Sequence, residues 1–156
     1  MQHVTTTDMT FAGGAGSSST SRPRGRPIHR MLVWFSAAYF SGALVTDLVY
    51  WQTPDVLWER FSIWLIMAGL VMAALAAVAY LIDLAAGRQI DRPALPRVIG
   101  YALAGLLSVL NAFVHSRDGY TAVVPTGLTL SALVVIVLLL TACVGMVLSN
   151  RSRVGG

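Results

Sequence analysis

Four long apolar stretches constrain the fold of this chain more than any other feature of its sequence. They cover about residues 31–52, 58–86, 97–116 and 124–150. Helices of about twenty to twenty-six residues extend roughly 30–39 Å, which is enough to cross the hydrocarbon core of a bilayer. The stretches do not alternate between polar and apolar residues, so the strands of a transmembrane barrel are not expected. The sequence therefore predicts an all-α, polytopic membrane protein with a bundle of four transmembrane helices.

Composition agrees with this fold class and divides the chain into three parts. Only 12% of the residues are charged, against 56% hydrophobic, and soluble domains carry roughly twice that share of charge. Residues 1–28 are rich in Ser, Thr and Gly and contain two prolines, which predicts a disordered basic tail. Residues 29–150 form the predicted membrane domain, and residues 151–156 form a short cytoplasmic end.

Arginine placement predicts the orientation in the membrane. With four spans, the amino-terminal tail, the loop of residues 87–96 and the carboxyl end share one side. That side holds Arg22, Arg24, Arg26, Arg30, Arg88, Arg92, Arg97, Arg151 and Arg153. The opposite side holds only Arg60 and Arg117. Because basic residues near spans favour the cytoplasmic side, both termini are expected in the cytoplasm.

The basic tail is expected to contact lipid. Its arginines lie directly before the first span, and each would add up to about 1 kcal/mol of attraction to an anionic inner leaflet. These lipid-facing residues are Arg22, Arg24, Arg26 and Arg30. Nucleic acid is not an expected partner, because the basic residues are few and form no folded patch.

Two groups of polar residues are expected inside the membrane boundary. Asp47 and Asn111 each lie about 7–8 Å below the outer boundary, so they are expected to pair, with His115 or Arg117 above them. At the cytoplasmic end, Asp83 is expected to contact His29 or Arg30.

Each polar group has two readings. It can fix the register and rotation of the helices, or it can take part in handling a ligand, a proton or a cofactor. Small residues recur every four positions on two helices and predict close packing between helices. They are Gly69, Ala73 and Ala77 on the second helix, and Gly100, Ala104, Ser108 and Ala112 on the third.

No sequence motif predicts catalytic chemistry, a metal site or a cofactor. Cys143 is the only cysteine, so neither an intrachain disulfide nor a cysteine metal site is expected. The chain has no glycine-rich phosphate loop and no catalytic triad pattern. We therefore expect a protein that is not an enzyme.

Several short motifs along the chain match those of a known protein family. Residues 26–33 read RPIHRMLV, where the family has HPIHPMLV. Residues 46–50 read TDLVY, residues 80–83 read YLID, and residues 124–128 read VPTGL after an Asn near the end of the third helix. These motifs resemble a family of bacterial four-span membrane proteins, the domain of unknown function DUF2231. The resemblance implies a four-helix fold and a place in the bacterial inner membrane. Arg26 and Arg30 replace a His and a Pro of the first motif, and Ser36 replaces a common Pro.

Three functions remain open. The first is a non-enzymatic structural or accessory bundle, which fits the short loops and the small-residue stripes. The second is a small oligomeric transporter or proton-handling protein that uses Asp47 and Asp83. The third is a b-type haem redox protein, although His29 and His115 are expected at opposite membrane faces. A second copy of the chain or another membrane protein is the expected protein partner.

Overall fold

Four long helices make up almost all of the part of the chain that the structure describes. This computed structural model describes residues 28–87, 94–117 and 123–154. The helices are α1 (Ile28–Gln52), α2 (Val56–Ala85), α3 (Ala94–His115) and α4 (Leu128–Val154). All four are long and apolar enough to cross a membrane, and the described ranges contain no strand. The predicted all-α fold with four membrane-length helices is therefore confirmed. The predicted tail lies outside the described residues, except for Ile28, which begins α1.

Local signals place the helix ends. The Asp55 side chain caps α2 by accepting a hydrogen bond from the Leu57 amide at 2.9 Å. Gly87 follows α2 with a φ of 64°, a conformation that glycine adopts without strain. α4 is preceded by the wide turn η1 (Val123–Gly127), in which Val124 has extended backbone angles. A residue before proline favours extended backbone angles, as Val124 shows before Pro125, and the regular α-helix begins at Leu128.

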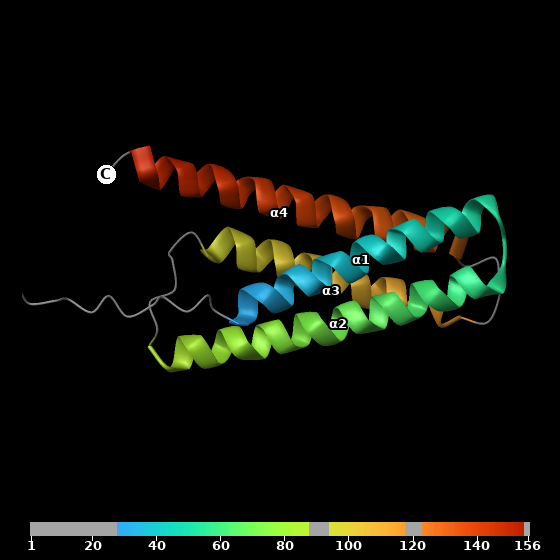
Figure 1. The fold of residues 1–156 in the computed structure, drawn as a ribbon, viewed down its shortest axis with the longest axis horizontal. Coiled ribbons are helices and arrows are strands. Elements are labelled where there is room, and N and C mark those ends of the chain that lie inside the picture. Colours follow the sequence, from blue (N-terminus) through green and yellow to red (C-terminus); the bar gives the residue numbers. More distant parts are fainter. Residues whose placement is uncertain (1–27, 88–93, 118–122, 155–156) are drawn as a thin grey trace, which may run out of the picture.

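The helices run alternately up and down, as Figure 1 shows. The hairpins α1–α2 and α3–α4 pack most extensively, and they join through the pairs α1–α4 and α2–α3. The start of α1, the end of α2, the start of α3 and the end of α4 therefore lie at one end of the bundle (Figure 1). The α1–α2 turn lies at the opposite end, here called the turn end.

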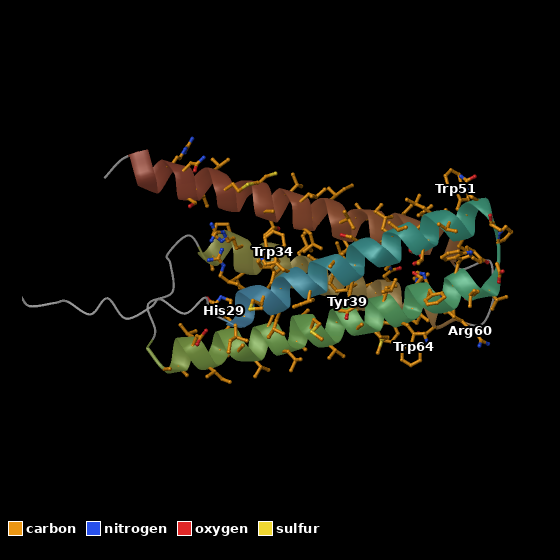
Figure 2. All side chains as sticks on the ribbon, in the orientation of Figure 1. His29, Trp34, Tyr39, Trp51, Arg60 and Trp64 are labelled. Atoms are coloured by element: carbon orange, nitrogen blue, oxygen red, sulfur yellow. The ribbon has the colours of Figure 1, made fainter. Side chains whose placement is uncertain are left out.

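The side chains show the arrangement expected of a protein surrounded by lipid. Large apolar residues cover the outside: Trp34 is 70% exposed and Trp64 is 74% exposed. Figure 2 shows Trp51 and Trp64 projecting from the bundle. The apolar core is small and centres on Phe40, Ala104 and Val134. Since lipid solvates the outer residues, the polar residues become the main occupants of the interior.

The buried face of α2 differs from the predicted four-residue stripe. Gly69 is buried against the Phe40 ring, but Ala77 is exposed and Ala76 is buried instead. The buried residues are Ser62, Ile66, Gly69, Ala76 and Asp83. Steps of three and four residues keep one face turned inward along a helix that winds around its neighbours, whereas a strict step of four drifts away.

Candidate functional site

Polar side chains from all four helices converge near the turn end of the bundle. They are Asp47 from α1, Ser62 from α2, Asn111 and His115 from α3, and Ser131 from α4. We call these five residues the Asp47 cluster. Asp47 and Ser62 lie at similar distances along the chain from the α1–α2 turn, so the hairpin brings them to the same depth. Asn111 and Ser131 have the same relation across the α3–α4 connection.

Asp47 is the centre of the cluster and is completely buried. Its Oδ1 accepts a hydrogen bond from the Ser62 hydroxyl and lies 3.1 Å from His115 Nε2. Its Oδ2 accepts a hydrogen bond from the Ser131 hydroxyl at 2.5 Å. Removing a carboxylate from water is costly unless donors replace its hydration, and here groups on three other helices supply them.

Neighbouring groups hold the His115 ring in a single orientation. Its Nδ1 lies 3.0 Å from the backbone oxygen of Asn111, one turn earlier in α3. Its Nε2 lies between Asp47 Oδ1 and the Ser62 hydroxyl oxygen, which is 3.3 Å away. Gly127 closes the space beside the ring, because a Cβ atom there would lie 2.8 Å from His115 Cε1. The glycine is therefore required for this packing.

Asn111 reaches Asp47 through an intermediate residue. Its amide donates to the Ser131 hydroxyl at 2.7 Å, and that hydroxyl donates to Asp47. We expected Asn111 to contact Asp47 directly; the structure inserts Ser131 between them. The side-chain oxygen of Asn111 is buried and has no hydrogen-bond donor among the described residues.

Of the two residues expected above Asp47, the structure brings His115 to the carboxylate. Arg117 lies past the end of α3 and is exposed. Sequence reasoning missed Ser62 and Ser131. Serine is common in membrane helices, so its presence alone does not indicate a site. The one sequence signal for these two serines is that their depth in the membrane matches that of Asp47 and Asn111.

A second polar pair lies at the other end of the bundle. His29 Nδ1 is 3.1 Å from Asp83 Oδ2, and the His29 ring meets Tyr80 edge-on with centroids 5.7 Å apart. The two side chains of the pair are 19% and 11% exposed. Of the two residues expected near Asp83, the structure therefore brings His29 to it, while Arg30 is exposed. Arg22, Arg24 and Arg26 lie outside the described residues.

An apolar layer separates the two polar ends. Phe40, Ala104 and Val134 form it with three flanking leucines and Val137, and Phe40 lies about 10 Å along α1 from Asp47. The other buried serine and threonine hydroxyls donate to backbone oxygens of helices rather than to each other. They are Ser36, Thr46, Ser108 and Thr141. The described residues therefore contain no continuous chain of polar side chains between the Asp47 cluster and the His29–Asp83 pair.

Arg97 makes a separate polar contact between α3 and α4. Its guanidinium donates to the backbone oxygen of Gly145 at 2.7 Å. A Cβ atom at position 145 would lie 2.5 Å from Arg97 Nε, so the glycine allows the side chain to lie against α4. Within the described ranges, no three His, Cys, Asp or Glu side chains are grouped to hold a metal ion.

Comparison with known proteins identifies a family but no individual relative. The model of a family described as predicted membrane protein (DUF2231) matches residues 25–156, a range that includes all four helices. No curated protein and no solved structure matches the chain.

Proposed function

The chain belongs to the predicted membrane protein family DUF2231, and from this membership and the geometry of the bundle we propose a non-enzymatic structural or accessory role in a bacterial inner membrane. The observation that carries the proposal is the Asp47 cluster, which uses one buried carboxylate to join all four helices. Most hydrogen bonds of the cluster join side chains on different helices. In this role the cluster fixes the rotation and register of the helices, and the lipid-facing surfaces contact other proteins.

The proposed orientation places both termini in the cytoplasm. Nine arginines lie on the side of the termini and the α2–α3 connection, against two on the other side. The Asp47 cluster would then lie below the outer membrane surface, and His29 and Asp83 would lie at the inner surface. The arginines of residues 22–30 would contact anionic headgroups there.

Placement of the polar residues makes the two alternatives weaker. A transporter needs a path across the bundle, and the apolar layer around Phe40 separates the two polar ends in a single chain. A haem bound between two histidines requires both side chains to line the same pocket. His29 lies at the start of α1 and His115 at the end of α3, and each is paired with an aspartate.

Two measurements on the full chain test the proposal. The first is proton flux into proteoliposomes that contain a pH-sensitive dye, driven by a membrane potential. We expect the same rate as in protein-free liposomes. A transport role would be indicated instead if the unmodified chain gave a faster flux, Asp47→Asn abolished it, and the matched exposed variant Asp55→Asn kept it.

The second measurement addresses the accessory role. The full chain is extracted from its native membrane in polymer-bounded lipid discs, and the mass of the protein assembly in each disc is measured by native mass spectrometry. We expect a defined complex with another membrane protein or with further copies of the chain. A single chain in every disc would contradict an accessory role.

A further inference from the structure

The hydrogen-bond partners of His115 determine how many protons the Asp47 cluster holds. Nδ1 faces the backbone oxygen of Asn111 at 3.0 Å, and a carbonyl oxygen can only accept. Nδ1 must therefore carry a hydrogen. This leaves Nε2 as the nitrogen whose protonation can change.

Nε2 also faces acceptors. It lies 3.1 Å from Asp47 Oδ1, and the single hydrogen of the nearby Ser62 hydroxyl is directed to the same carboxylate oxygen. Two lone pairs at this distance would repel each other, so one proton has to lie between Nε2 and Oδ1. Imidazole is a stronger base than a carboxylate, so the proton is assigned to Nε2 opposite an ionised Asp47.

Charged groups around the pair act on this proton. Burial of His115 opposes its charged form, whereas Asp47 on α1 and Glu59 on α2 are the negative groups among the described residues that favour it. α4 has no ionisable side chain facing the cluster, since its first charged residue is Arg151 at the other end. Arg117 on the α3 end is exposed. Without the proton the cluster would carry a net negative charge inside the membrane boundary, which is costly.

The turn end is the nearer end of the bundle for proton exchange with the pair. His115 lies in the last turn of α3, next to the exposed Ser116 and Arg117. Toward the other end, the layer of Phe40, Ala104 and Val134 intervenes. Both side chains of the pair are fully buried, so a proton reaches them only through local movement, for which the turn end is the nearer side. Among the described residues, no chain of polar side chains continues from the pair to His29 and Asp83.

The unpaired oxygen of Asn111 gives the cluster one unused acceptor. Asn111 is 2% exposed, and its side-chain oxygen has no donor among the described residues. Buried polar atoms are normally paired, and a small donor such as water is the chemistry that satisfies a buried amide oxygen.

We propose that Asp47 and His115 form a binding site for one proton that exchanges with the turn end of the bundle, and that the side-chain oxygen of Asn111 binds the water that delivers it. Loading transfers a proton from hydronium to the pair and leaves a water as hydrogen-bond donor to Asn111. Unloading leaves the imidazole lone pair facing the carboxylate, so α1 and α3 lose their contact at this end. The site would thus couple the proton concentration outside to the packing of the bundle.

The first test is a pH titration of ring nitrogen signals by solid-state NMR. The variant with His3→Gln and His29→Gln keeps His115 as its single histidine and is studied as the full chain in lipid bilayers, beside the unmodified chain. We expect both ring nitrogens of His115 to be protonated at low pH and only Nε2 to lose its proton as the pH rises. Titration at Nδ1, or an Nε2 without a proton at every pH, would overturn the proposal.

The second test concerns sidedness and water. In sealed proteoliposomes of established orientation, changing the pH only at the turn end should shift the infrared carboxyl bands of Asp47, and changing it at the other end should not. The band of a buried water, identified by its shift in heavy-oxygen water, should disappear in Asn111→Leu and persist in Ser116→Ala. A response to pH at the wrong end, or a water band unaffected by Asn111→Leu, would contradict the proposal.

Discussion

At the scale of single residues, Asp47 has the most demanding environment in the molecule. Its two oxygens are satisfied by Ser62, His115 and Ser131, each on a different helix. A buried acidic residue of this kind adds little net stability by itself, because its desolvation offsets much of the attraction. Its hydrogen-bond partners are nevertheless buried with it, so removing one member of the cluster leaves buried polar atoms of the others without a hydrogen-bond partner.

Asp47→Asn tests this dependence. The substitution keeps the shape of the side chain but removes the charge that faces His115. We expect a loss of about 3 to 5 kcal/mol in the free energy of unfolding, measured by detergent titration in mixed micelles. Asp55→Asn is the matched control, because Asp55 is exposed and Asn caps helices as well as Asp. Equal losses in the two variants would contradict the cluster described above.

Ser131→Ala tests the connection to Asn111. It removes one donor to Asp47 and the acceptor of the Asn111 amide, so we expect a loss of about 1 to 3 kcal/mol in the free energy of unfolding. Thr129→Ala is the control on the same helix, because the Thr129 hydroxyl is exposed and bonds only to the nearby oxygen of Thr126. The same titration compares both variants, and no difference between them would mean that the Ser131 contacts are not formed.

At the scale of helices, packing relies on small residues where backbones approach one another. Gly100 on α3 lies so close to Thr141 on α4 that a Cβ atom would overlap the threonine side chain. Gly105, five residues later on α3, has no neighbouring atom within 4 Å of where its Cβ would lie. Gly100 is therefore needed for close packing of α3 against α4, whereas Gly105 on the same helix is not.

Alanine substitution at these glycines should have opposite effects. Gly100→Ala is expected to reduce the free energy of unfolding by about 1 to 3 kcal/mol, because α3 and α4 must separate to admit the methyl group. Gly105→Ala is expected to raise it by about 0.5 to 1 kcal/mol, because alanine favours the helix. Thermal unfolding of both variants in one detergent provides the measurement, and destabilisation by Gly105→Ala alone would contradict the packing.

Sequence alone predicts the helices well because lipid imposes a simple rule on them. A run of apolar residues long enough to span the bilayer must form a helix, and the four runs allow little else. The depths of Asp47 and Asn111 also follow from counting residues. The contribution of Ser131 and the burial of Ala76 rather than Ala77 do not, because each depends on the rotation of a helix about its axis. That rotation is set by packing between helices, which no single segment encodes.

At the scale of the whole molecule, the bundle is asymmetric along its axis. The turn end holds a buried cluster that joins four helices, whereas the opposite end holds a partly exposed His29–Asp83 pair that joins two. Among the described residues, arginines have the opposite distribution. Arg60 and Arg117 lie at the turn end, and the end with the termini holds Arg30, Arg97, Arg151 and Arg153. The end with the termini thus carries more of the described positive charge, and the turn end holds more of the buried polar contacts.

Cysteine labelling tests the proposed orientation. Cys143 is the only cysteine, so Cys143→Ser provides a background for single cysteines at Thr53 in the α1–α2 turn and at Asn150 near the end of α4. In intact cells with a permeable outer layer, an impermeant maleimide should label Thr53→Cys and leave Asn150→Cys unlabelled until the membrane is opened. The reverse pattern would place the termini outside.

The interaction between Asp47 and His115 is the contact on which the proposed structural role and the proton site both depend, and a double-mutant cycle measures it most directly. The cycle compares the free energies of unfolding of the unmodified chain, Asp47→Asn, His115→Gln and the double variant in lipid bicelles. We expect the two substitutions together to cost less than the sum of their separate costs, with a coupling energy of about 1 to 3 kcal/mol. Strictly additive losses would mean that the two side chains do not interact in the membrane and would contradict the cluster.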